Sequence, residues 1–185
     1  MSYLYYATFS SAFGTFTIVW IENNNSLRLQ RIFLSDHERR SEIKALDTFK
    51  QIKIGSSSLI ESIGKEIQQF FKGEVVDFNL DLLDFNVCSE AQKNVLIAEY
   101  GIPRGWVSTY KRIAIKIGIP NGARAVGKSL AKNPFPIIIP CHRAIKTNGE
   151  LGGYQGGIKM KRTLLEMEGI KFSEKGKVIT KNIYY

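Results

Sequence analysis

At residues 137–143 the chain reads IIIPCHR, and the rest of the sequence is organised around this stretch. Three isoleucines carry the chain into the interior, Pro140 stops the run, and a thiol, an imidazole and a guanidinium follow without a gap. The thiolate is the nucleophilic form of cysteine, and nearby cations lower the thiol pKa from about 8.5. We expect Arg143 and a protonated His142 to do this for Cys141. For an isolated Cys–His pair, a buried structural cysteine beside a hydrogen-bonded histidine is the alternative, because free cysteine packs as a small core residue.

The composition is that of a soluble globular protein. The chain has 185 residues, of which 44% are hydrophobic and 23% charged, enough for one large domain or two small ones. There is no apolar run of membrane-spanning length and no basic-then-apolar leader, so we expect a cytoplasmic protein, or a nuclear one in a eukaryote, with no membrane partner. A four-ligand zinc site would need both cysteines and both histidines, including the neighbours Cys141 and His142. We therefore expect no metal and no cofactor.

The charge is distributed unevenly along the chain. Residues 1–88 carry 9 Lys and Arg against 11 Asp and Glu, a net charge of −2. Residues 89–185 carry 17 against 6, a net charge of +11, and the two halves add up to +9. This asymmetry favours a polyanion-binding half beside a scaffold. A merely lysine-rich surface is the alternative.

The first half reads as a strand-rich scaffold. Aromatic and β-branched residues predict strands over Tyr3–Phe9, Gly14–Trp20 and Leu27–Phe33, arranged as an antiparallel meander. The charged segment 35–57 has no clear periodicity and is not assigned. A capping box of Ser58 with Glu61 predicts an amphipathic helix that Gly73 ends, and the alternation over residues 78–82 predicts a half-exposed strand or an extended linker.

The second half reads as a series of helices. A capping box of Ser89 with Gln92 opens a helix that runs to Tyr100, and Ser108 or Thr109 caps a helix over 110–117. A glycine-containing break leads to a helix over 123–131, and two short helices so joined are typical of a helix-turn-helix unit.

Small and basic residues alternate on the second of these helices. Ala123, Ala125 and Gly127 stand among Arg124 and Lys128, a pattern that favours close approach to a nucleic-acid groove. A tight helix–helix contact is the alternative.

A glycine-rich loop with one aromatic residue follows at 149–157, and a last helix over 158–168 is ended by Gly169. Glu168 then stands at the helix C-terminus, where a carboxylate opposes the helix dipole. We expect it to pair with His142, whereas a solvated surface carboxylate is the alternative. The tail reads as peripheral, with a possible short strand at 177–180.

Six ordered motifs between Ala91 and Gly169 closely resemble those of the O6-alkylguanine-DNA alkyltransferases. They are Ser108-Thr109-Tyr110, Ala123-Arg124-Ala125-Val126-Gly127, Asn133-Pro134, Ile139-Pro140-Cys141-His142-Arg143, Gly152-Gly153-Tyr154-Gln155-Gly156-Gly157 and Glu168-Gly169. The resemblance implies an α+β protein with a ribonuclease H-like antiparallel sheet and helix, followed by a winged-helix-like helical domain with a helix-turn-helix. We place the scaffold domain at 1–86, the DNA-binding and active-site domain at 87–172, and the tail at 173–185.

The resemblance also implies a reaction. Cys141 would take the alkyl group from O6-alkylguanine, and from O4-alkylthymine, in a direct and irreversible transfer that consumes the protein in one turnover. His142 would act as a base on the thiol through a water, Glu168 would orient it, and Asn133 would support the site.

The implied partner is double-stranded DNA, bound by a monomer in the minor groove without sequence preference. The target nucleotide would be flipped out, with Arg124 filling the vacated stack, Tyr110 pressing on the backbone, and Tyr154 lining the pocket. The remaining positions that match DNA or substrate contacts are Gln92, Lys111, Thr147, Ala125 and Gly127.

Two other classes of function compete with this one. A lesion-binding module without catalysis would share the scaffold, but alkyltransferase-like proteins carry Trp where this chain has Cys141. A cysteine hydrolase would need an oxyanion hole and would leave the basic helix-turn-helix without a role.

Overall fold

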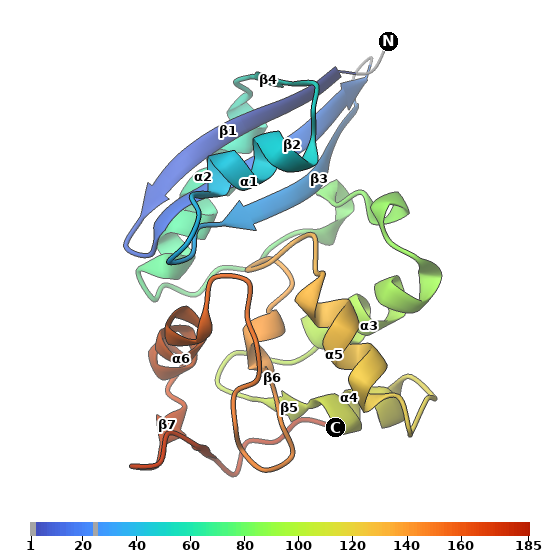
Figure 1. Cartoon of the computed structure of the whole chain (residues 1–185), viewed down its shortest axis with the longest axis vertical. Helices are drawn as coiled ribbons and strands as arrows, with labels where there is room; N and C mark the ends of the chain where they lie inside the picture. The colour runs from blue at the N-terminus through green and yellow to red at the C-terminus, as the bar shows by residue number, and fades with distance from the viewer. Residues whose placement is uncertain (1–2, 24–25) are drawn as a thin grey trace. The chain divides into compact units, whose positions relative to one another are not determined.

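The computed structural model describes residues 3–23 and 26–185 and has an α+β architecture (Figure 1). The chain forms two compact units. The N-terminal unit runs to Val87 and also contains Pro134–Ile138, and the C-terminal unit contains Cys88–Asn133 and Ile139–Tyr185. The expected boundary at 86/87 lies one residue earlier. The return of Pro134–Ile138 to the N-terminal unit was not expected, and neither was the inclusion of the tail in the C-terminal unit.

The sheet of the N-terminal unit contains the three predicted strands and a fourth. Strands β1 (Tyr3–Ser11), β2 (Gly14–Asn23) and β3 (Ser26–Leu34) pair antiparallel as predicted. Strand β4 (Ile52–Ile54) adds to β1 in parallel, giving the order β3-β2-β1-β4. The sheet is therefore mixed rather than purely antiparallel.

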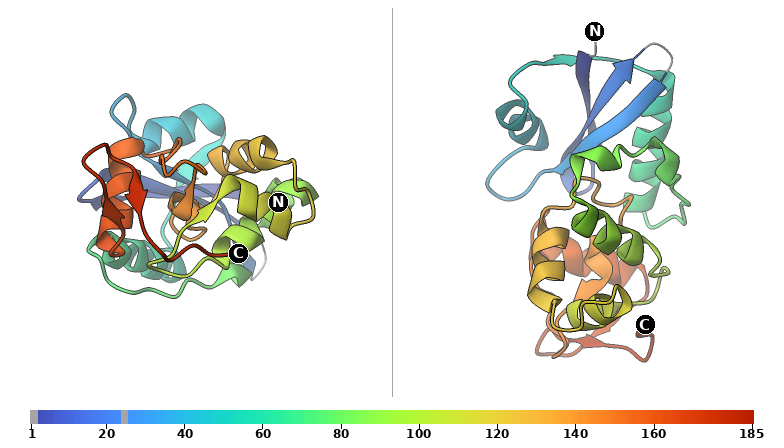
Figure 2. Two further views of the ribbon diagram at one scale, coloured as in Figure 1. Left: turned by 90° about the horizontal axis from the view of Figure 1, so that it is seen from below. Right: turned by 90° about the vertical axis from the view of Figure 1, so that its right-hand side faces the viewer.

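Two helices cover opposite faces of this sheet (Figure 2). Helix α1 (Ser41–Thr48) packs with Ala45 against one face, and helix α2 (Ser58–Phe71) packs with Phe71 against Phe16 on the other. The predicted capping box is wrong: the N-cap of α2 is Ser57, and its side chain makes no capping hydrogen bond. The C-terminus is as predicted, because Gly73 adopts a φ of 91° and closes the helix.

The segment after α2 is neither a strand nor a fully extended linker. Residues Leu80–Leu82 and Phe85–Val87 form short 3-10 helices, η1 and η2. Phe78 and Leu83 are buried beside them. The alternation of apolar and polar residues over 78–82 therefore accompanies two short helical turns, not a pleated strand.

The C-terminal unit contains the predicted helices at nearly the predicted bounds. Helix α3 is Glu90–Tyr100, α4 is Tyr110–Lys116, α5 is Ala123–Ala131 and α6 is Ile158–Met167. The hydroxyl of Ser89 caps α3, and that of Thr109 caps α4, by accepting backbone N–H hydrogen bonds. Helices α4 and α5 pack against each other across the glycine-containing turn.

The C-terminal tail is an integral part of this unit, contrary to the expectation. Strand β7 (Lys171–Phe172) pairs with β8 (Val178–Ile179), while β5 (Ser108–Thr109) pairs in parallel with β6 (Ala144–Ile145). Beyond β8, Val107 exchanges backbone hydrogen bonds with Asn182 and Tyr184 on the tail. No helix in the described part of the chain has the length and apolar character needed to cross a membrane.

Candidate active site

The Cys-His-Arg sequence forms a tight turn in the interior of the C-terminal unit. Cys141–Arg143 is a 3-10 helix, η3, that starts after Pro140. The N–H of Cys141 donates to the carbonyl of Ile139 at 2.8 Å, and the side-chain amide of Asn133 donates to the same carbonyl at 3.1 Å. The loop that presents the thiol is thus fixed by Asn133, one of the predicted site residues.

Glu168 pairs with His142, as predicted from the helix end. Oε1 of Glu168 lies 2.9 Å from Nε2 of His142, and the guanidinium of Arg143 donates to both carboxylate oxygens at 2.8–3.2 Å. All three side chains are buried. The alternative of a solvated surface carboxylate is therefore wrong.

The charges of this network follow from its hydrogen bonds. Although burial opposes ionisation, the hydrogen bonds from His142 and Arg143 lower the pKa of Glu168 to about 2. Burial lowers the pKa of His142, and the hydrogen bond to Glu168 opposes this only in part. The resting site therefore holds an ionised carboxylate, a guanidinium that balances it, and a neutral imidazole.

The expected depression of the thiol pKa is wrong. Burial raises the pKa of Cys141 to about 12, against the hydrogen bond from Asn133, which favours the thiolate. Arg143 is balanced by Glu168 and His142 is neutral, so neither supplies the free positive charge that the sequence suggested. A protonated thiol needs a base before it can attack.

Cys141 opens into a small cavity of about 60 Å³ in the C-terminal unit. Its wall consists of Tyr110, Gly127, Leu130, Ala131, Cys141, Gly153, Tyr154 and Gln155. The Tyr154 ring stands edge-on to His142 at a centroid distance of 6.3 Å, and its buried hydroxyl has no hydrogen-bond partner among the described residues. The cavity thus offers a flat wall and one unused hydroxyl close to the thiol.

Two glycines near this cavity differ in their steric role. A Cβ on Gly152, whose φ is 73°, would lie 2.5 Å from the hydroxyl of Tyr110, so only glycine fits there. A Cβ on Gly127 would meet Tyr110 only at 3.8 Å, an ordinary contact. Packing inside the unit does not require a glycine on α5, which weighs against the tight helix–helix alternative.

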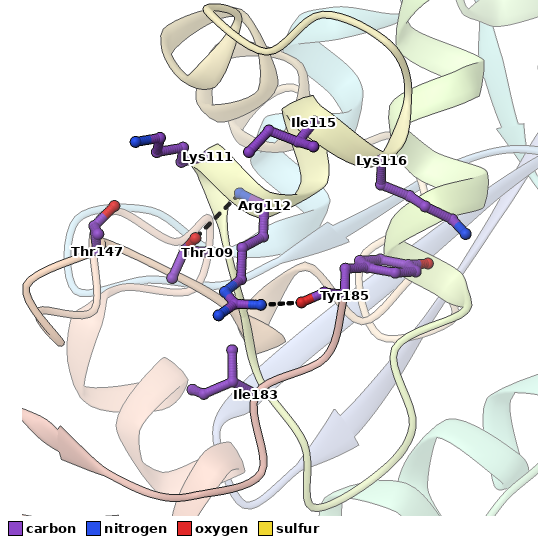
Figure 3. A pocket seen from close by; sticks show the side chains of 8 residues that line it. All are labelled: Thr109, Lys111, Arg112, Ile115, Lys116, Thr147, Ile183 and Tyr185. Atoms are coloured by element: carbon purple, nitrogen blue, oxygen red, sulfur yellow. Dashed lines mark hydrogen bonds between the residues drawn. The ribbon is translucent and has the colours of Figure 1, made fainter.

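The other predicted contact residues lie outside the cavity. Arg124 and Ala125 are exposed on α5. Lys111 and Thr147 line a surface groove of about 740 Å³ beside Arg112 and Lys116, which Figure 3 shows. The amide of Gln92 donates to the carbonyls of Ser129 and Lys132, so it ties α3 to the end of α5.

Two ionisable residues near the thiol were not predicted from the sequence. Lys161 on α6 is fully buried and donates to the carbonyl of Ala144 at 2.6 Å, while Glu99 on α3 is also fully buried. Both interact electrostatically with Cys141. Glu99 lies three residues after Leu96, and Lys161 lies three residues before Leu164, so each falls on the apolar face of its helix. This spacing is the signal that could have predicted their burial.

Comparison with known proteins identifies the family. Residues 90–170 match the family described as "6-O-methylguanine DNA methyltransferase, DNA binding domain". A methylated-DNA–protein-cysteine methyltransferase of Methanosarcina acetivorans is 32% identical over 90% of this chain and 99% of that protein. The chain belongs to the methylated-DNA–protein-cysteine methyltransferase family.

Two further members support this assignment. The methyltransferase of Methanothermobacter thermautotrophicus is 46% identical over 60% of this chain, and the match spans 62% of that relative's length. The crystal structure of Mycobacterium tuberculosis OGT in complex with DNA superposes with a TM-score of 0.70 at 32% identity, over 89% of this chain and 92% of that one. The methyltransferase fold thus extends over both units, beyond the motifs of the second half.

Proposed function

We propose that this protein repairs DNA by transferring an alkyl group from O6 of guanine, or from O4 of thymine, to the sulfur of Cys141. The observation that carries this proposal is a buried thiol at a small cavity, next to a neutral imidazole that a buried carboxylate orients. Membership of the methyltransferase family supports it independently. The structural division supports a ribonuclease H-like N-terminal unit as scaffold and a winged-helix-like C-terminal unit that does the chemistry.

The proton step follows from the state of the network. Because the Glu168 carboxylate can only accept, the proton of His142 resides on Nε2, and Nδ1 is the basic nitrogen. Nδ1 takes the proton of the Cys141 thiol through a bridging water. The imidazolium that forms is stabilised by Glu168, which lies 2.9 Å away and is already ionised. This is a Cys–His–Glu form of the activated nucleophile.

The transfer itself exchanges one bond for another. The sulfur–carbon bond forms as the carbon–O6 bond breaks, and the electron pair stays on the guanine, which takes up a proton to become ordinary guanine. The product thioether has no good leaving group, so Cys141 is not regenerated. Asn133 holds the loop that carries Cys141, and Tyr154 lines the cavity into which the base enters.

Access to the target requires DNA to bind at α5. Arg124 is exposed and makes no hydrogen bond or ion pair with the residues that the structure describes, so it is available to fill the place of a flipped nucleotide. Ala125 and Gly127 allow the helix to approach the minor groove of duplex DNA, and Tyr110 presses on the backbone beside the target. Binding that relies on the backbone and on the shape of the minor groove has no strong sequence preference, and one monomer in the cytoplasm completes the repair.

A stoichiometry experiment tests this function. The protein is incubated with excess duplex that contains O6-methylguanine, and the methyl groups removed are counted per protein molecule. We expect a burst that ends at one equivalent, also for Cys88→Ser, and no removal by Cys141→Ala, which still binds the duplex. Continued turnover, or removal by Cys141→Ala, would contradict the mechanism.

A further inference from the structure

A second buried carboxyl group lies in the C-terminal unit outside the Glu168 network. Glu99 is fully buried on α3, and neither of its carboxyl oxygens has a hydrogen-bond partner among the described residues. The other buried residues of α3 are Val95 and Leu96, so a carboxyl occupies a position where the helix pattern calls for an apolar side chain. The proposed reaction gives this group no role.

Several elements place ionisable groups around Glu99. Those that interact with it electrostatically are Lys161 on α6, Cys141 and Arg143 in η3, Tyr110 on α4 and Tyr185 in the tail. Helix α3 packs against η3. The chain links the two directly, because Ile102 donates its N–H to the Glu99 carbonyl and accepts from Arg143 at 2.6 Å.

The two cations in this cluster differ in availability. Arg143 is neutralised by Glu168. Within the described part of the chain, Lys161 donates only to neutral carbonyls, those of Ala144 at 2.6 Å and Gly153 at 3.5 Å. Burial lowers the pKa of Lys161 to about 8 and raises the pKa of Glu99 to about 8. At neutral pH the cluster therefore contains one ammonium, one protonated carboxyl and one protonated thiol.

We propose that Glu99 and Cys141 compete for one negative charge beside the Lys161 ammonium, so that Glu99 must keep its proton when the thiol attacks. The inference rests on the proposed function, because it takes Cys141 as the nucleophile. Two like charges that share a buried site do not both ionise. Once the cluster has lost one proton, every molecule with a Glu99 carboxylate is a molecule without a thiolate. Glu99 is thus a positioning residue: its own protonation decides how readily the Cys141 thiol ionises.

The pH dependence of thiol reactivity tests this competition. In a Cys88→Ser background, Cys141 is alkylated with iodoacetamide between about pH 6 and about pH 9. The variant Glu99→Gln has the shape of the permanently protonated carboxyl, and Glu90→Gln, exposed on the same helix, is the matched control. We expect all three proteins to react equally at about pH 6. Towards about pH 8, where Glu99 loses its proton while Lys161 still carries part of its charge, the rate should rise less steeply in the parent and in the control, so that Glu99→Gln is about twofold faster at about pH 8.

The outcome separates charge from packing. A purely structural role of Glu99 would change the rate by the same factor at every pH, so parallel profiles or a uniformly slower variant would overturn the proposal. Since iodoacetamide needs no DNA, this result is independent of whether the protein removes methyl groups from DNA.

A second measurement follows the titration of the Glu99 carboxyl group directly. With carbon-13 in the glutamate carboxyl groups, one NMR signal should titrate near pH 8 instead of in the ordinary range. That signal should be the one that Glu99→Gln removes. If every glutamate carboxyl titrates in the ordinary acidic range, Glu99 is ionised at neutral pH and the proposal fails.

Discussion

Glu168 and Glu99 are both buried in the C-terminal unit, yet they are in opposite charge states. Glu168 accepts hydrogen bonds from His142 and Arg143, and its pKa is about 2. Glu99 has no hydrogen-bond partner for its carboxyl oxygens among the described residues, and burial raises its pKa to about 8. Burial alone does not fix the charge of a carboxyl group; the donors that face it do. Glu168 can therefore stabilise a His142 imidazolium. Glu99, which stays protonated at neutral pH, does not neutralise the Lys161 ammonium, which can then stabilise a Cys141 thiolate.

The largest expected effect is on the pH dependence of stability. The folded protein holds the Glu99 proton up to about pH 8, whereas the unfolded chain releases it above about 4.5. Stability contributed by this group therefore falls as the pH rises from 4.5 to 8, by roughly 5 kcal/mol. Urea unfolding of Glu99→Gln should lack this fall, and Glu90→Gln should retain it. Equal slopes in all three proteins would mean that Glu99 is ionised in the fold.

Glu168→Gln should destabilise the folded protein, whereas Glu99→Gln should remove a loss of stability that grows with pH. The Glu168→Gln change leaves the buried Arg143 without its counter-charge, which costs about 3–5 kcal/mol of unfolding free energy. Transfer should slow and its pH profile should move upward, because His142 becomes a weaker base for the thiol, while the affinity for undamaged DNA stays unchanged. Glu166→Gln, exposed on the same helix, is the control. A wild-type rate at every pH would show that Glu168 has no part in the proton step.

Arg124→Ala should separate the buried chemistry from nucleotide flipping. Flipping a base out of the stack costs a few kcal/mol, and a side chain that fills the vacated place offsets part of this cost. Without Arg124, repair of a duplex should therefore slow by a factor on the order of a hundred. The reaction with free O6-benzylguanine, which needs no flipping, should keep its rate, and Lys128→Ala should repair the duplex nearly normally. Equal losses on both substrates would place Arg124 in the pocket instead of the stack.

The smallest expected effect concerns the groove that Lys111 and Thr147 line. Lys111→Ala should weaken DNA binding modestly and lower the slope of log affinity against log salt by about one, because one phosphate contact is lost. Lys65→Ala, exposed on α2 of the N-terminal unit, should leave the slope unchanged. An unchanged slope for Lys111→Ala would remove this groove from the DNA interface.

Much of the fold could be predicted because its signals are local. The hydroxyl caps Ser89 and Thr109 and the closing glycines Gly73 and Gly169 lie next to strongly periodic segments, and the structure has helices there. Helix α1 could not be found, because it has no side-chain cap and buries only Ser41 and Ala45. Strand β4 is three residues long and gains its place only by pairing with β1.

The site was predictable in its contacts but not in its charges. A carboxylate at an unfavourable helix end pointed correctly to a partner, and Glu168 does pair with His142. The thiol pKa was predicted in the wrong direction, because a sequence shows that Arg143 is adjacent but not that Glu168 neutralises it. Lys161 and Glu99 were missed because their burial depends on packing between α3, α6 and η3.

In the proposed reaction the alkyl group ends on Cys141. The most direct measurement is peptide mass spectrometry of the protein after reaction with one equivalent of duplex carrying an isotope-labelled O6-methyl group. We expect a single labelled methyl on the peptide that contains Cys141, with unmodified guanine left in the DNA. Label on Cys88, label in solution as methanol, or guanine removed from the strand would contradict it.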